Sequence, residues 1–131
     1  MKTAIVILNW NGAKLLPQFL PSVINYSKDA EVYIIDNAST DNSIYLIKTE
    51  FPSVKIIQNK GNYGFAKGYN EGLKQINAEY FCLLNSDVEV TENWLQPIEE
   101  LFDQNNDIAA IQPKILDYKN KKYFEYAGAG G

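Results

Sequence analysis

Short apolar runs alternate with helix-period segments along this chain, and that alternation restricts the possible folds more than any other feature. The apolar runs occupy residues 4–8, 32–35, 54–57 and 80–84. The first of them, residues 4–8, is continuous and is typical of a strand buried on both faces of a parallel sheet, and the others are predicted as further strands. Between them, apolar residues recur at the spacing of one helix face. The order predicts an α/β fold, a Rossmann-like, doubly wound and mostly parallel sheet.

The same pattern predicts where each element begins and ends. Helices are expected over 15–24, over a segment capped by Ser39 or Thr40 and stopped by Pro52, over 65–76 and over 94–102. A further strand is expected within 108–116, a polar turn at 117–122 and a last short strand at 123–126. A length of 131 residues suits one domain with its own core, so residues 1–131 are expected to form a single domain.

Composition excludes several classes of function. The net charge is -4, and no basic stripe is present, so nucleic acid is not an expected partner. The chain has no histidine, and all 12 basic residues are lysines, so histidine-based proton transfer is excluded within it. The charge of a phosphorylated ligand would have to be met by lysine, backbone N–H groups or a metal ion.

Cysteine usage and hydropathy suggest a compartment. The one cysteine, Cys82, lies in an apolar run, which excludes a disulfide within the chain and a cysteine metal cluster. It is interpreted as a buried residue in a reducing, cytoplasmic compartment. The sequence has no apolar run long enough to span a bilayer and no signal-peptide pattern.

Polar side chains follow each predicted strand. They are Asn9 after the first, Asp36, Asn37 and Ser39 after the second, Asn59 after the third, and Asn85 and Asp87 after the fourth. Ligands of open α/β sheets bind beyond the carboxyl ends of the strands. With a strand order of 3-2-1-4, Asp36 and Asp87 would lie about 10 Å apart on either side of Asn9. That spacing suits the two ends of a nucleotide better than one shared metal, and Asp36 is expected to accept hydrogen bonds from a base or ribose.

The stretch GNYGFAKGYNEG, residues 61–72, is rich in glycine but matches neither the dinucleotide fingerprint nor a P-loop. Gly68 and Gly72 fall in a helical pattern, where each costs about 1 kcal/mol relative to alanine. Close helix packing and a bound ligand both remain open as reasons for these two glycines. Lys67 falls in the first helical turn, where the macrodipole disfavours a cation. Either an anion bound there or a lysine extended into water would account for it.

Four pieces of sequence together resemble the family 2 glycosyltransferases, inverting enzymes of the GT-A fold, and most closely their rhamnosyltransferase-like bacterial branch. The pieces are VILNWNG (6–12), DNASTDNS (36–43), NYGFAKGYNEGL (62–73) and LLNSDVEV (83–90). They agree in order and spacing, and the resemblance covers essentially the whole chain. It implies transfer of a sugar, with inversion, from a nucleotide-diphosphate donor such as a UDP- or dTDP-linked sugar to a glycan or lipid-linked acceptor.

The resemblance also implies roles for residues. Asn9 and Asp36 would lie against the nucleoside, and Asn85-Ser86-Asp87 would stand where the family has its DxD-type motif. Asp87 is then the expected protein ligand of Mg²⁺ or Mn²⁺, with donor phosphates and water completing the shell. The full set of expected donor-binding residues is Asn9, Asp36, Asn37, Ser39, Asn59, Gly64, Phe65, Lys67, Asn70 and Asn85.

In length the chain departs from the family pattern. The family's general base and acceptor-binding half follow a glycine-rich loop that AGAGG, residues 127–131, resembles. No catalytic residue can be assigned, and the chain is interpreted as the donor-binding portion of a longer enzyme. Because lipid-linked acceptors are common in the family, contact with the inner membrane face is a further expectation. The alternative is a non-catalytic nucleotide- or partner-binding module.

Overall fold

The computed structural model describes residues 2–113, 115–120 and 124–126, and for 124–126 the backbone only. Its residues fall into two compact units, Met1–Glu92 and Asn93–Gly131, each described by itself. The expected glycine-rich loop at 127–131 lies outside the described residues. Within the described part, no helix is both long and apolar enough to cross a membrane.

The first unit is built on a four-stranded parallel sheet of order β3-β2-β1-β4. Its strands are β1 (Thr3–Asn9), β2 (Glu31–Asp36), β3 (Lys55–Gln58) and β4 (Tyr80–Leu84). The predicted parallel sheet and its strand order are therefore confirmed. Because β1 lies in the middle of the sheet, its side chains from Ala4 to Ile7 are almost completely inaccessible to water.

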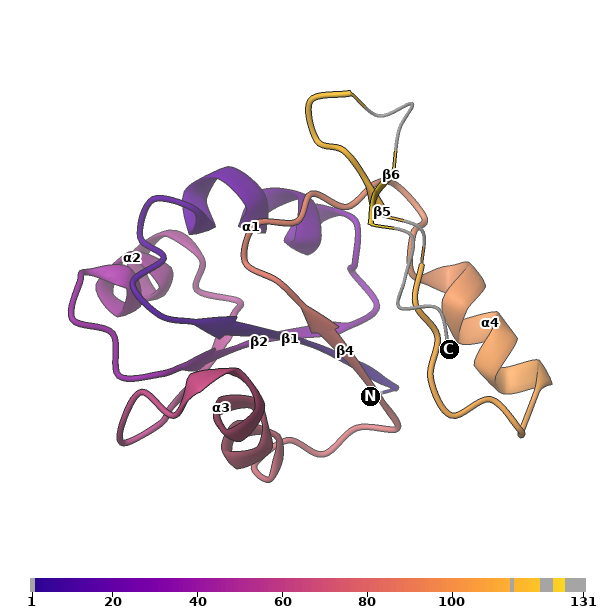
Figure 1. Cartoon of the computed structure of the whole chain (residues 1–131), viewed down its shortest axis with the longest axis horizontal. Helices are drawn as coiled ribbons and strands as arrows, with labels where there is room; N and C mark the ends of the chain where they lie inside the picture. The colour runs from indigo at the N-terminus through magenta and orange to yellow at the C-terminus, as the bar shows by residue number, and fades with distance from the viewer. Residues whose placement is uncertain (1, 114, 121–123, 127–131) are drawn as a thin grey trace. The chain divides into compact units, whose positions relative to one another are not determined.

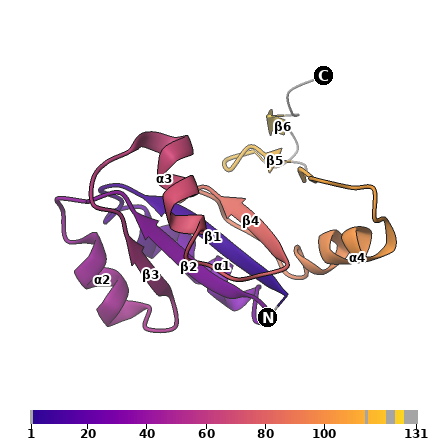
Figure 2. The same ribbon diagram turned by 90° about the horizontal axis from the view of Figure 1, so that it is seen from below.

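Three helices cover the sheet, as predicted. They are α1 (Leu16–Asn25), α2 (Ser43–Glu50) and α3 (Gly64–Leu73). Figures 1 and 2 show α1 and α2 on one face and α3 on the other. Right-handed crossovers require this arrangement, because the chain moves outward from β1 to β3 and then returns across β1 to β4. The reversal creates a topological switch point between β1 and β4.

The glycines of α3 let the helix approach the sheet closely. A Cβ at Gly72 would overlap the side chain of Ile35, and one at Gly68 would lie 2.7 Å from the amide nitrogen of Asn37. Both glycines are buried. Close packing against β2 is thus sufficient to explain them. Ile76, predicted to lie on this helix, follows it instead but joins the same core.

The start of α2 differs from the prediction. Ser39 and Thr40 do not cap this helix, which begins at Ser43 with Asn42 in the cap position. Asp41 takes the capping role, because its carboxylate accepts hydrogen bonds from the backbone N–H and hydroxyl of Ser43. Burial acts to raise the pKa of Asp41, but the bonds from Ser43 and from the N–H of Ala13 outweigh it and lower that pKa.

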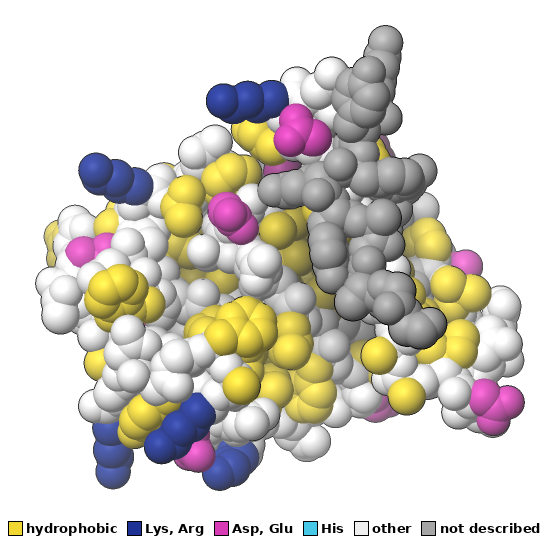
Figure 3. All heavy atoms as spheres, viewed as in Figure 1, with side chains coloured by type: hydrophobic (Ala, Val, Ile, Leu, Met, Phe, Trp, Pro, Cys, Tyr) yellow, Lys and Arg dark blue, Asp and Glu magenta, His cyan; other side chains and the backbone are white. Residues whose placement is uncertain are grey.

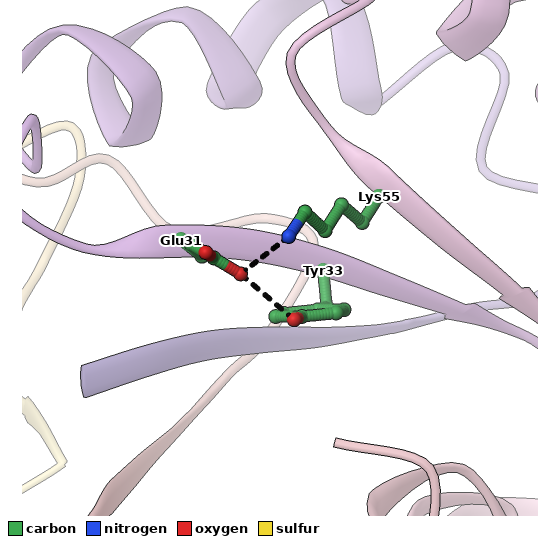
Figure 4. Close-up of polar contacts among 3 residues, drawn as sticks. All are labelled: Glu31, Tyr33 and Lys55. Atoms are coloured by element: carbon green, nitrogen blue, oxygen red, sulfur yellow. Dashed lines mark hydrogen bonds and ion pairs between the residues drawn. The ribbon is translucent and has the colours of Figure 1, made fainter. Parts of the chain in front are cut away.

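At the amino ends of β2 and β3 a polar cluster lies opposite the predicted ligand edge. The Lys55 ammonium and the Tyr33 hydroxyl both donate to Glu31, at 2.7 and 2.8 Å (Figure 4). The bond from Lys55 is the main cause of a lowered Glu31 pKa. On the face shown in Figure 3, lysines gather at the lower left around an acidic side chain, and the other charged side chains among the described residues are scattered.

The second unit contains α4 (Gln96–Gln104) and an antiparallel pair formed by β5 (Ile115–Leu116) and β6 (Phe124–Tyr126). The helix and both strands were predicted, although β5 is shorter than the apolar stretch in which it was expected. Tyr123, the predicted first residue of the last strand, lies outside the described residues.

Candidate functional site

The carboxyl ends of β1 and β2 form a buried polar corner. Asn9 and Asp36 are register partners, and the Asn9 amide donates to the Asp36 carboxylate at 2.9 Å. The Ser39 hydroxyl donates to the same carboxylate at 2.7 Å, and the Ser39 N–H donates to its second oxygen at 2.9 Å. Asp36 is 3% exposed. Its carboxylate therefore organises the turn after β2, and three of the predicted site residues lie in direct contact.

The carbonyl oxygen of the Asn9 side chain is buried and has no hydrogen-bond partner among the residues that the structure describes. The amide nitrogen of the same side chain is used twice, by Asp36 and by Ser39 at 3.2 Å, which fixes the orientation of the group. A Cβ at Gly12 would overlap the unpaired oxygen, so glycine is required beside it. A buried acceptor left unpaired costs about 1–3 kcal/mol, so a hydrogen-bond donor that reached this oxygen would stabilise the corner.

Asn11 joins the loop after β1 to the loop after β2. Its side-chain oxygen accepts hydrogen bonds from the backbone N–H groups of Thr40 at 2.8 Å and Asp41 at 3.2 Å. Its own N–H donates to the Ser39 hydroxyl at 2.9 Å. Asn11 has a φ of 53°, in the left-handed region that asparagine tolerates better than most residues. Sequence reasoning assigned Asn11 no role, although an asparagine before a glycine is a turn signal.

A second set of asparagines attaches α3 to the sheet. The Asn59 amide donates to the side chain of Asn37 at 2.9 Å and to the Gly68 carbonyl at 3.1 Å. The Asn37 amide donates to the Gly64 carbonyl at 2.9 Å. Asn37 and Asn59 are buried. These two predicted site residues thus fix where the first turn of α3 lies.

The remaining predicted residues on α3 are exposed. Gly64 begins the helix with a φ of 78°, and Phe65 is 64% exposed while its ring lies edge-on to Tyr69. Lys67 extends outward, with its ammonium 4.5 Å from the centre of the Tyr63 ring. Asn70 lies on the exposed side of the same helix.

Asn85 and Asp87 follow the end of β4, and both are exposed. The segment is anchored on its carboxyl side, where the buried Val90 donates its N–H to the Ser22 hydroxyl of α1 at 3.1 Å. Among the described residues, no three acidic or cysteine side chains gather in a way that could hold a metal ion. Asp87 is therefore available as a single carboxylate.

Tyr69 belongs to this region but was predicted only as an apolar helix residue. Its hydroxyl lies within hydrogen-bonding distance of the Leu8 N–H, the Val6 carbonyl and the Leu84 carbonyl, at 3.3, 3.3 and 3.2 Å. Burial raises the pKa of this hydroxyl. The available signal was the residue type, because a buried tyrosine hydroxyl needs partners that phenylalanine does not.

Comparison with known proteins places the chain in a family. The profile described as glycosyl transferase family 2 matches residues 4–127. An uncharacterized glycosyltransferase of Nostoc sp. is 30% identical over 128 residues, which cover 92% of this chain and 39% of that protein. Another, of Haemophilus influenzae, is 26% identical over 82% of this chain and 35% of its own length. The chain thus spans about two fifths or less of these relatives.

Two solved structures share the fold. S. aureus TarS in complex with UDP-GlcNAc superposes with a TM-score of 0.71 at 23% identity, covering 81% of this chain and 32% of that one. Mannosyltransferase PcManGT from Pyrobaculum calidifontis, in complex with GDP-Man and Mn²⁺, gives 0.61 at 19% identity, covering 67% and 28%. The four-stranded parallel sheet is thus of the GT-A type, and the chain belongs to glycosyl transferase family 2.

Proposed function

We propose that this chain binds a nucleotide-diphosphate sugar, UDP- or dTDP-linked, at the carboxyl edge of its sheet. In the whole protein the sugar would pass, with inversion, to a glycan or lipid-linked acceptor. Family membership and the likeness to structures that hold UDP-GlcNAc or GDP-Man support a donor of this kind. The four sequence pieces support a place in the rhamnosyltransferase-like branch.

The observation that carries the proposal is the unpaired Asn9 side-chain oxygen. It lies at the carboxyl end of the central strand, at the edge where α/β sheets bind ligands. Trp10, the next residue, is 54% exposed. We assign this corner to the nucleoside, with an aromatic ring available for stacking on a base. Asp36, Asn37, Ser39 and Asn59 would act mainly by holding the corner and the start of α3 in place.

The diphosphate would lie toward Asp87, Asn85 and the exposed side of α3, which carries Gly64, Phe65 and Lys67 in its first turn and Asn70 in the next. A single exposed carboxylate fits Mg²⁺ or Mn²⁺, since such ions are often held by one or two carboxylates together with substrate phosphates. The ion would neutralise charge on the leaving diphosphate. Asp87 would hold it, and Lys67 would supply positive charge in a chain without arginine.

Titration calorimetry with UDP, dTDP and GDP, each with and without Mn²⁺, tests the proposal. We expect one of the three to bind, and to bind more tightly with the metal. A Gly12→Ala variant should lose this binding, because its methyl group would displace the Asn9 oxygen. Absence of binding by all three nucleotides, to wild-type protein shown to be folded by circular dichroism, would contradict the proposal.

A non-catalytic nucleotide- or partner-binding module is the second candidate, since the described residues suggest no general base. It predicts nucleotide binding without sugar transfer by the longest available form of the protein. For the transferase we propose a cytoplasmic location with contact at the inner membrane face, which fits a lipid-linked acceptor. Sedimentation with anionic vesicles would test that contact.

A further inference from the structure

Tyr69 lies at the topological switch point of the sheet, between β1 and β4. There the chain, after adding β2 and β3 on one side of β1, adds β4 on the other side. Tyr69 projects from α3, and its hydroxyl reaches backbone groups on both strands of the switch point, Leu8 and Val6 on β1 and Leu84 on β4. Leu84 is the last residue of β4 and the last in register with β1, opposite Ile7. A side chain from α3 thus contacts both strands at their last register pair, Ile7 and Leu84.

This last register pair leads directly to the proposed metal-binding segment. Asn85, Ser86 and Asp87 follow Leu84 without a break, so the direction in which they leave the sheet depends on where the Leu84 peptide lies. On the far side, the bond between the Val90 N–H and Ser22 anchors the chain to α1. The segment is therefore held at both ends, and Tyr69 provides the tie on the side of Asn9.

The contact requires a hydroxyl as well as an aromatic ring. The Tyr69 ring packs in the core with Ala4, Val6 and Ile35, and phenylalanine would retain that packing. Only the oxygen can accept a hydrogen bond from the Leu8 N–H and donate to a carbonyl on the same edge. Because α3 also carries Lys67 and Phe65, the hydroxyl connects that helix to the end of β4.

We infer that Tyr69 is a positioning residue, which fixes Asp87 relative to the Asn9 corner so that one donor molecule can reach both. The inference rests on the proposed function. Tyr69 itself is buried, 3% exposed, and would act only through the Leu84 peptide. Its loss should therefore weaken the metal-dependent part of nucleotide binding and leave the metal-independent part unchanged.

The test compares Tyr69→Phe with Tyr33→Phe in the full chain. Tyr33 is a matched control, because it belongs to the same sheet and donates a hydroxyl hydrogen bond to Glu31 (Figure 4). The Tyr33→Phe variant removes this bond at the amino end of β2, away from the proposed site. Calorimetry with UDP, dTDP and GDP, with and without Mn²⁺, measures the metal-dependent and the metal-independent affinity for the nucleotide. Amide hydrogen exchange over residues 85–89 gives a readout that needs no ligand.

We expect Tyr69→Phe to weaken binding with Mn²⁺ by about five- to tenfold, the value of one hydrogen bond, with metal-free binding unchanged. Exchange at 85–89 should be faster in Tyr69→Phe than in Tyr33→Phe. Equal affinities and equal exchange in the two variants would overturn the inference while leaving the proposed function standing. If the wild type binds no nucleotide, the proposed function fails, and faster exchange alone would support only the structural tie.

Discussion

At the scale of single residues, Asp87 is exposed, and the chain is anchored three residues after it, at Val90. The structure gives its side chain no part in the core, so Asp87→Ala should abolish metal-dependent nucleotide binding and leave the thermal unfolding midpoint unchanged. Calorimetry with Mn²⁺ and a melting curve measure the two effects. Glu79→Ala is the control, since it removes an exposed carboxylate just before the other end of the same strand. Equal binding by the two variants would refute the metal assignment.

Cys82, expected to be buried, is half-buried in the structure, and its pKa allows a second prediction. Burial raises the pKa of this thiol from 9.0 to about 11, so the folded protein keeps it protonated where an unfolded chain would begin to ionise. Any stability that this proton contributes is present below pH 9.0 and is lost as the pH rises toward about 11. At about pH 8, iodoacetamide should modify Cys82 much more slowly in folded protein than in urea, because the thiolate is the nucleophile. Similar rates would show that the thiol is accessible.

Individual residues also show what the sequence could predict. Its pattern of polar residues after strands correctly brought Asn9, Asp36 and Ser39 together, because the carboxyl ends of parallel strands share one edge. It did not reveal that the Asp36 carboxylate would already be occupied by neighbouring donors. Which of several nearby polar groups pair with one another depends on side-chain geometry, which the residue order does not contain.

At the scale of elements, the approach of α3 to β2 depends on Gly72. A Gly72→Ala variant should lose about 1–3 kcal/mol of unfolding free energy, because its methyl group would overlap Ile35. Chemical denaturation measures this loss. A double variant that also carries Ile35→Ala should be less destabilised than the sum of the two single variants. Additive losses would mean that α3 can shift without resistance.

The tie between the first two loops can be separated from backbone strain at Asn11. Asn11→Gly removes the side-chain hydrogen bonds to Thr40 and Asp41 but tolerates the positive φ. Asn11→Ala removes the same hydrogen bonds and is also strained at the positive φ. We expect a loss of about 1 kcal/mol for glycine and about 1–2 kcal/mol more for alanine. Urea unfolding would measure both, and equal losses would show that strain at this position is negligible.

Element boundaries were predicted well where apolar runs were long and less well where capping decided them. The strand at Tyr80–Leu84 was predicted residue for residue, because a polar corner ends it. The start of α2 was predicted too early, because Ser39 and Thr40 do not cap the helix. Instead, Ser39 hydrogen-bonds to Asp36 and Thr40 to Asn11 in the neighbouring turn. Competing partners across loops are a tertiary effect that a local capping rule does not include.

At the scale of the whole molecule, every residue of the proposed site lies in the first unit, Met1–Glu92. A chain of residues 1–92 should therefore unfold in one cooperative transition and bind the nucleotide with the affinity of the full chain. Circular dichroism and calorimetry test both statements. A cooperative fragment that binds far more weakly would mean that residues beyond 92 contribute to the site. The alternation of elements predicted the parallel sheet, and the strand order assumed for it agrees with the structure, whereas the division near residue 92 had no signal in composition.

The central place of β1 has a consequence for how the protein is made. Its residue Thr3 pairs with Tyr80 of β4, a separation of 77 residues along the chain. At a synthesis rate of about 5–20 residues per second, one edge of β1 would wait roughly 4–15 seconds for its neighbour. During that time an unpaired strand rich in isoleucine and valine could template pairing with other chains. The strand that finally pairs with this edge of β1 is β4, and Asp87 follows it closely in the chain.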